Sequence, residues 1–172
     1  MALTNVIVDV TCALDQKKYA IGIFLDLSKA FDTVDHNILL HKLFNYGIRG
    51  KAHDWITNYL RHRFQYVNIN STSSDLREVV CGVPQGSILG PLLFIIYMND
   101  IDASSTKLTF TMFADDTTIL YKHHDLVQGV RQVNNELITV HDWLCCNKLS
   151  LNIDKTNSIV FHTMAWERNL LT

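Results

Sequence analysis

The stretch Lys107-Leu-Thr-Phe-Thr-Met-Phe-Ala-Asp-Asp-Thr-Thr-Ile-Leu-Tyr121 places two adjacent acids, Asp115 and Asp116, between two apolar segments. Apolar and polar residues alternate before the acids, and β-branched and aromatic residues follow them. This pattern predicts a β-hairpin with the acids at its turn. Neighbouring carboxylates repel each other, so a half-buried pair usually needs cations, and hard oxygen ligands favour Mg²⁺ or Mn²⁺. Because Asp is also a common turn former, a solvated turn is the competing interpretation.

A second stretch, Tyr19-Ala-Ile-Gly-Ile-Phe-Leu-Asp-Leu27, is almost continuously apolar but contains one acid, Asp26. Such a run is typical of a strand buried on both faces. An unpaired buried carboxylate is costly, so we expect Asp26 to meet a cation or to lie where the strand opens into a cleft. A local lysine pair or a turn cap is the alternative. If the fold brought Asp26 to the distant acid pair, three carboxylates around two divalent metals would suit nucleotidyl transfer.

Periodicity and turn residues locate the remaining elements. Apolar residues at helical spacing predict helices over residues 3–17, 52–63, 88–101 and 125–146. Asp32 or Thr33 is expected to cap a further helix that ends at Gly47, with Asp35 as another capping acid. A hairpin is predicted within 65–81, and a strand, a turn and a strand within 151–161. The helix over 88–101 is apolar nearly all round, and we expect it to be buried.

The composition is that of one globular domain with a substantial core, since 48% of the 172 residues are hydrophobic. The formal charge of −2 counts against a polyanion partner, unless basic surfaces lie on other segments. The four cysteines match no zinc spacing and are interpreted as reduced core thiols. No signal peptide or spanning segment is recognisable, so we expect a soluble intracellular chain.

Four segments, in order along the chain, resemble motifs A, B, C and D of reverse transcriptases. They are Phe24-Leu-Asp-Leu-Ser-Lys-Ala-Phe-Asp-Thr-Val-Asp-His36, Gly82-Val-Pro-Gln-Gly-Ser-Ile-Leu-Gly-Pro-Leu-Leu-Phe94, Phe113-Ala-Asp-Asp116 and Asn147-Lys-Leu-Ser-Leu-Asn-Ile-Asp-Lys-Thr156. The similarity is greatest to the non-LTR (LINE-type) retrotransposon group and extends from about Ala20 to Phe161. Where many retroviral relatives have Tyr, this chain has Phe113, which is familiar in the LINE-type group.

The resemblance implies a metal site. Asp26 and Asp115 would be the principal metal ligands, and Asp116 would be a third, less direct carboxylate. The Leu27 carbonyl would help to hold a metal. Lys155 would donate a proton to pyrophosphate or contact a phosphate, with an ordinary turn lysine as the alternative.

The resemblance also implies a nucleotide site. Phe31 would block a ribose 2′-hydroxyl and so select deoxynucleotides, with a plain core role as the alternative. Gln85 and Gly86 would lie under the incoming nucleotide and the template base. From the residues alone, the two glycines and the proline of Gly82–Ser87 predict a shaped loop, in which Gly86 lets backbone approach a ligand. An ordinary connection between a strand and a helix is the alternative.

By resemblance, the fold is expected to be α+β: a polymerase palm with a mainly antiparallel sheet covered by helices. Residues 1–172 would form a partial reverse transcriptase domain, with a fingers remnant in 48–80. The N-terminal part of the fingers and the thumb would lie outside it.

The function implied is RNA-directed DNA polymerisation, in which dNTPs are transferred to a primer 3′-hydroxyl with two Mg²⁺ or Mn²⁺. The partners would be an RNA template, a DNA primer, dNTPs and the rest of a parent polyprotein, with an endonuclease as a further candidate domain and no membrane. The alternative is a truncated or domesticated inactive fragment that acts as a binding module. An RNA-templated RNA polymerase is disfavoured by Phe31 and by the sequence of the motif B segment.

Overall fold

The computed structural model describes residues 2–163, so residue 1 and residues 164–172 of the expected domain lie outside the described residues. The chain divides into two compact units. The first contains the residues up to Ser28, Asp100–Cys146 and the residues from Ser150 onward, and the second contains Lys29–Asn99 and Asn147–Leu149. None of the helices in the described range is long and apolar enough to cross a membrane.

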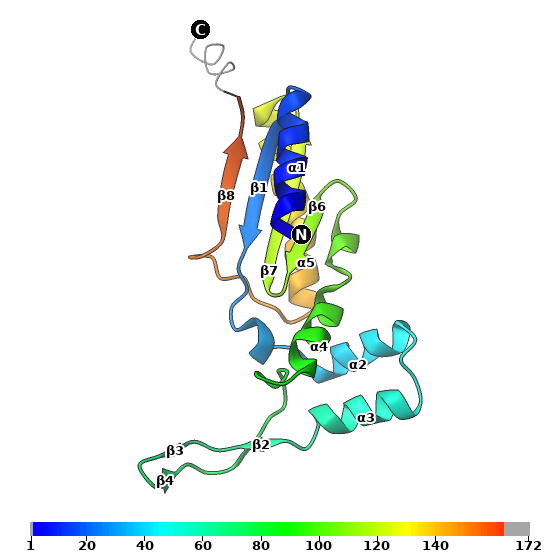
Figure 1. Ribbon diagram of the computed structural model, residues 1–172, viewed down its shortest axis with the longest axis vertical. Helices are drawn as coiled ribbons and strands as arrows, with labels where there is room; N and C mark the ends of the chain where they lie inside the picture. Colours follow the sequence, from blue (N-terminus) through cyan, green and yellow to red (C-terminus); the bar gives the residue numbers. More distant parts are fainter. Residues whose placement is uncertain (1, 164–172) are drawn as a thin grey trace. The chain divides into compact units, whose positions relative to one another are not determined.

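The first unit is built on an antiparallel sheet of four strands in the order β6-β7-β1-β8, which can be followed in Figure 1. The strands are β1 (Tyr19–Leu25), β6 (Thr109–Phe113), β7 (Asp116–His123) and β8 (Asn157–Phe161). Strand β1 lies between β7 and β8, which explains why its sequence is an apolar run. The helices of this unit are α1 (Ala2–Asp15), the short 3-10 helix η2 (Ile101–Ser104) and α5 (Leu126–Cys146).

Helices α1 and α5 cover opposite faces of this sheet, as Figure 1 shows. Lys122, which pairs with Ala20 in the sheet, donates to Asp9 of α1 at 2.5 Å. The next residue of β1, Ile21, points to the other face, because successive side chains of a strand alternate. There a Cβ on Gly129 of α5 would lie 3.2 Å from Cδ1 of Ile21. The expected antiparallel sheet with helical cover is confirmed, with one helix on each face.

The second unit is mainly helical. Its helices are η1 (Ala30–Asp32), α2 (His36–Asn45), α3 (Lys51–Leu60) and α4 (Leu89–Met98). Helix α2 packs against α3 and α4, and Leu39, Leu43, Leu60, Phe94 and Tyr97 form a core with no exposed side-chain surface.

Helix α4 is less buried than its sequence indicated. Ile88, just before its first residue, is 96% exposed, and Leu92 and Ile95 are about half exposed. These positions share one side of the helix, whereas Leu93, Phe94 and Tyr97 are buried. The expectation of all-round burial was therefore wrong, because apolar composition alone does not show how many sides of a helix find a neighbour.

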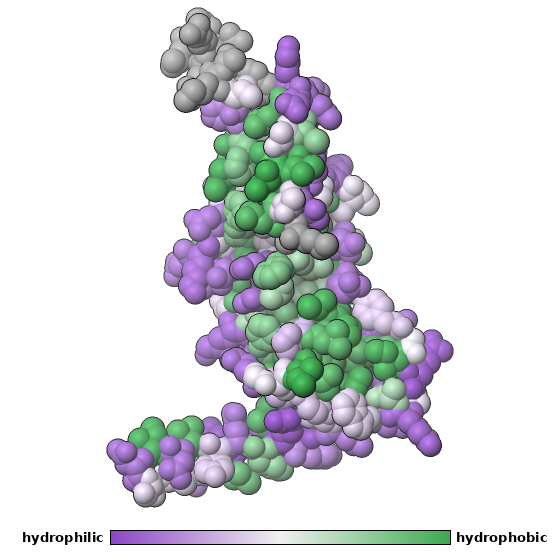
Figure 2. Space-filling view, in the orientation of Figure 1, coloured by the Kyte–Doolittle hydropathy of each residue, from purple (hydrophilic) through white to green (hydrophobic). Residues whose placement is uncertain are grey.

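A long hairpin connects α3 to the loop that precedes α4. Its paired segments are β2 (Phe64–Gln65) with β5 (Arg77–Glu78), and β3 (Asn68–Ile69) with β4 (Thr72–Ser73). Asn70 and Ser71, with φ of 48° and 66°, form a two-residue turn of the kind that suits a twisted hairpin. The large side chains Phe64, Tyr66, Val67, Ile69 and Leu76 are exposed, and Figure 2 shows hydrophobic surface interspersed with hydrophilic surface along the hairpin.

Two further expectations were wrong in part. Helix α2 begins at His36, and the capping role expected for Asp35 is confirmed, since its carboxylate accepts from the amides of Asn37 and Ile38. Asp32 does not cap this helix, because Ala30–Asp32 forms a 3-10 turn of its own. The four cysteines are free, as expected, but they are exposed and do not belong to the core.

Candidate active site

The acid pair lies at a tight turn. Phe113 and Asp116 are the last paired residues of β6 and β7, so Ala114 and Asp115 form a two-residue loop. Ala114 has a φ of 54°, a left-handed conformation that costs a non-glycine residue about 1 kcal/mol. Such strain clusters at functional sites. Asp115 lies in the turn and Asp116 is the first residue of β7, and both acids are exposed.

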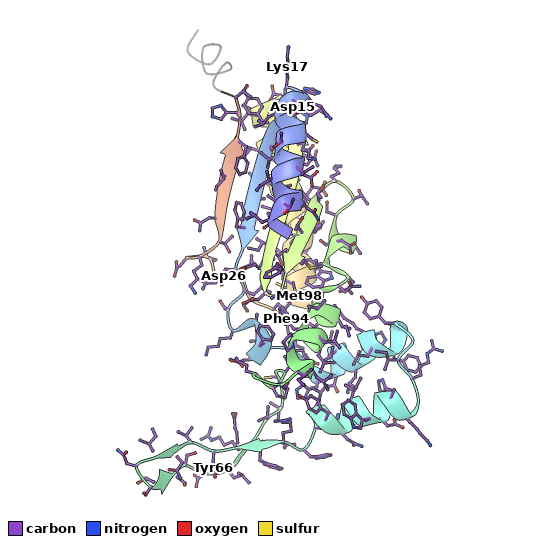
Figure 3. The ribbon with its side chains drawn as sticks, viewed as in Figure 1. Asp15, Lys17, Asp26, Tyr66, Phe94 and Met98 are labelled. Carbon is purple, nitrogen blue, oxygen red and sulfur yellow. The ribbon has the colours of Figure 1, made fainter. Side chains whose placement is uncertain are left out.

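Asp26 and Asp116 lie just beyond the last pair of the β1–β7 ladder, where β1 ends and β7 begins. Leu25 and Thr117 are the last paired residues, and the next position on the two strands is occupied by Asp26 and Asp116. Directly opposite residues of antiparallel strands share a face, with Cβ atoms about 4.5–5.5 Å apart. Asp26 is on the same face as Ala20, because an even number of residues separates them. Helix α1 covers this face, since Lys122, opposite Ala20, pairs with Asp9 of α1. Figure 3 labels Asp26 where β1 ends.

A cavity of about 570 Å³ opens beside these carboxylates. Its lining comprises Leu3, Val6, Phe24, Leu25, Asp26, Thr111, Phe113, Asp116, Thr117, Thr118 and Lys155. The expected cleft at the end of the buried strand is therefore present, and Asp26, Asp116 and Lys155 meet at it. Asp115 is outside this lining. The contribution of α1 through Leu3 and Val6 had no signal in the sequence beyond helical periodicity.

The donor set fits a hard divalent cation. Mg²⁺ is usually bound by one or two carboxylates together with water and substrate phosphates, and Asp26 and Asp116 supply two carboxylates at one cavity. Within residues 2–163, no group of three or more His, Cys, Asp or Glu side chains is close enough to hold a metal ion by itself. The leading role of Asp115 as a ligand stays a prediction.

The main chain beyond β1 is held by the segment that contains Lys155. Asn152 donates its amide to the Asp26 carbonyl at 2.9 Å, and Ser28 donates to the Ser150 carbonyl at 2.8 Å. Leu27 lies between these two bonds, opposite Leu151. Because carbonyls alternate in direction along an extended chain, that of Leu27 points away from this segment, toward the β7 edge. Its expected contact with a metal is compatible with this direction.

The expected nucleotide-binding residues lie in the second unit. Phe31 packs on Phe94 with ring centroids 4.6 Å apart, and its carbonyl accepts from the amide of Val83 at 2.8 Å. Gln85 donates from Nε2 to Asp32 Oδ1 at 2.8 Å. The loop before α4 is thereby attached to the second half of the motif A segment. Gly86 has a φ of 78° and open space where a Cβ would be, so backbone is accessible there.

An antiparallel sheet with a carboxylate at the end of its central strand and an acid pair on the adjoining hairpin is the palm of a nucleic-acid polymerase. The chain belongs to the reverse transcriptase (RNA-dependent DNA polymerase) family, whose model matches residues 2–168. The family inferred from motifs A to D is therefore confirmed.

Several relatives are polymerases of mobile elements. The chain is 27% identical over 156 residues to the RNA-directed DNA polymerase from mobile element jockey of Drosophila melanogaster. This match covers 87% of the chain and 17% of that protein. It is 30% identical over 166 residues to the probable RNA-directed DNA polymerase from transposon X-element of the same organism, covering 92% of this chain and 18% of that protein. The chain thus spans less than a fifth of the length of these relatives.

Solved structures share the fold. Telomerase from Candida tropicalis, solved with a fragment of telomeric RNA, superposes with a TM-score of 0.65 at 14% identity, covering 92% of this chain and 29% of that one. Telomerase from Candida albicans superposes with a TM-score of 0.62 at 15% identity, and the match covers 94% of this chain and 30% of that chain. At such identity the likeness concerns the fold alone, and it supports the palm architecture.

Proposed function

We propose that this chain is the catalytic palm of an RNA-directed DNA polymerase of a LINE-type mobile element. It would add deoxynucleotides to the 3′-hydroxyl of a DNA primer along an RNA template. The observation that supports this most is the opposite placement of Asp26 and Asp116, with Lys155 at the same cavity. The substrate class follows from the names of the relatives, and the remaining fingers and the thumb would belong to the rest of the parent protein.

Asp26, Asp115 and Asp116 are the proposed ligands of two Mg²⁺ or Mn²⁺ ions, with the Leu27 carbonyl as a further oxygen donor. When bound, such ions lower the pKa of the attacking hydroxyl and neutralise charge on the leaving pyrophosphate. The protein's own contribution is a fixed position for these charges, since β1 and β7 are paired up to the residues just before Asp26 and just after Asp116. Fixed charges need no reorganisation during the reaction.

The other residues act on the nucleotide. Lys155 protonates the leaving pyrophosphate or binds one of its phosphates. Phe31 excludes a ribose 2′-hydroxyl, while Gln85 and Gly86 support the incoming nucleotide and the template base. These roles follow from the family resemblance, and the accessible backbone at Gly86 is compatible with a ligand there.

Primer extension on an RNA template by the full-length protein tests this function. Asp26→Asn keeps the shape of the side chain but removes its charge, so we expect kcat to fall by about 1,000-fold or more, about 4 kcal/mol in the barrier. Asp142→Asn, at an exposed acid of α5, is the matched control and should retain activity. Full activity of Asp26→Asn or Asp115→Asn would contradict the site. If the wild-type protein binds Mg²⁺ but does not bind dNTPs and does not extend a primer, the inactive binding module is favoured.

A further inference from the structure

We propose that Thr156 is a positioning residue for Asp26, whose main chain it holds at the point where the sheet ends. This inference rests on the proposed function, because it assumes that the Asp26 carboxylate must be placed accurately beside Asp116. Thr156 itself is outside the lining of the cavity. Its role is therefore indirect and depends on a single hydrogen bond.

Asp26 lies beyond the regular ladders on both edges of β1. Pairing with β7 ends at Leu25, and pairing with β8 ends at Phe24. The Asp26 amide instead donates to the Thr156 side-chain oxygen at 3.3 Å, and the Asp26 carbonyl accepts from the amide of Asn152 at 2.9 Å. A side chain thus takes the place of a missing strand partner at the proposed metal ligand.

Thr156 is itself well placed to hold this position. Its amide donates to the Asn152 carbonyl at 2.9 Å, and that of Lys155 donates to the same carbonyl at 3.2 Å. A β-branched side chain also has few χ1 rotamers, so the hydroxyl stays near the Asp26 amide. The same turn therefore presents Lys155 to the cavity and fixes Asp26, which ties the acid and the lysine to one support.

The test compares Thr156→Val with Thr156→Ser in the full-length protein. Valine keeps the volume but cannot accept a hydrogen bond. Because a displacement of about 1 Å can reduce catalysis about 100-fold, we expect kcat in primer extension to fall about 10-fold to 100-fold. The half-saturating Mg²⁺ concentration should rise, while KM for dNTP changes less than about threefold. Serine, which keeps the acceptor, should restore kcat to within about threefold of wild type.

A direct measurement needs no activity. Hydrogen exchange of a peptide covering residues 24–28 reports on the Asp26 amide, which should exchange at least about 10-fold faster in Thr156→Val and not in Thr156→Ser. Thr139→Val is the matched control, since its hydroxyl bonds within α5 at an exposed position. It should leave kcat, the Mg²⁺ requirement and the exchange at residues 24–28 unchanged.

Two results would overturn the proposal: Thr156→Val with wild-type kcat and wild-type exchange, or Thr156→Ser as defective as Thr156→Val. If Thr156→Val fails to fold, as judged by circular dichroism, Thr156→Ala replaces it in the same comparison with serine. Failure of the proposed function is distinguishable, because the wild-type protein itself would then not extend a primer.

Discussion

Phe31 has a packing role in the structure and a proposed role in selecting deoxynucleotides. Its ring packs on Phe94, which is fully buried, and Phe31 itself is half-buried, so part of it is available to a ligand. We predict that Phe31→Val admits ribonucleotides and raises the ratio of kcat/KM for rNTP over dNTP by about 10-fold to 100-fold, the range in which an apolar pocket discriminates a hydroxyl. Steady-state primer extension with each nucleotide measures this ratio.

Phe94→Val is the control for lost packing. It removes the same ring volume from the other member of the aromatic pair and should destabilise the protein by about 2–4 kcal/mol without changing the nucleotide ratio. If both variants change the ratio equally, or if Phe31→Val leaves it unchanged, Phe31 is a plain core residue and the selective role is wrong.

At the scale of elements, the start of helix α2 depends on an ionised carboxylate. Burial by itself raises the pKa of Asp35, but hydrogen bonds from Lys148, Ile38 and Asn37 hold that pKa below its usual value. The Lys148 Nζ lies 2.6 Å from Asp35 Oδ2. A carboxyl whose pKa is lowered on folding stabilises the folded state above its unfolded pKa of about 3.9, and this contribution is lost as the pH falls through the lower folded pKa.

We therefore predict that Asp35→Asn, which keeps a capping oxygen but loses the charge, destabilises the protein by up to about 1 kcal/mol at pH 7. The difference from wild type should shrink as the pH falls below about 3.9. Asp35→Ala loses the cap as well and should cost about 1–2 kcal/mol. Urea unfolding at several pH values measures these differences, with Asp75→Asn in the exposed hairpin as the control. A penalty for Asp35→Asn that is independent of pH would contradict the ionic contribution.

Elements with a strong local pattern were predictable, and those set by tertiary neighbours were not. The helices over 3–17 and 125–146 and the acidic turn agree with α1, α5 and the β6–β7 hairpin to within a few residues, because periodicity and turn chemistry are local. The late start of α2 was missed, because Asp32, Thr33 and Asp35 are all acceptable caps in sequence. The bond from Asp26 to Thr156 spans 130 residues, and nothing in the hydropathy pattern indicates it.

At the scale of the whole molecule, the residues expected to act in the reaction are divided between the two compact units. Asp26, the acid pair and Lys155 belong to the first, and Phe31 and the loop residues Gln85 and Gly86 belong to the second. Charge is also a property of the whole chain. Its 15 basic residues are outnumbered by 17 acidic ones, although a polymerase must hold polyanionic strands. Since binding to phosphates depends on released counterions, these residues alone supply little nonspecific affinity for RNA.

We therefore predict that residues 1–172 alone bind RNA weakly, whereas the proposed parent polymerase binds RNA tightly. Fluorescence anisotropy with a labelled single-stranded RNA at increasing salt measures both. For Z phosphate contacts the slope of log K against log salt is about −0.7Z, so we expect about −1 for the isolated chain and about −4 or steeper for the full-length protein.

Circular dichroism of the isolated chain is the control for folding. Equal affinities and equal slopes would mean that residues 1–172 themselves contain the main phosphate-binding surface, and the exposed hairpin with Arg63 and Arg77 would then be the first region to mutate.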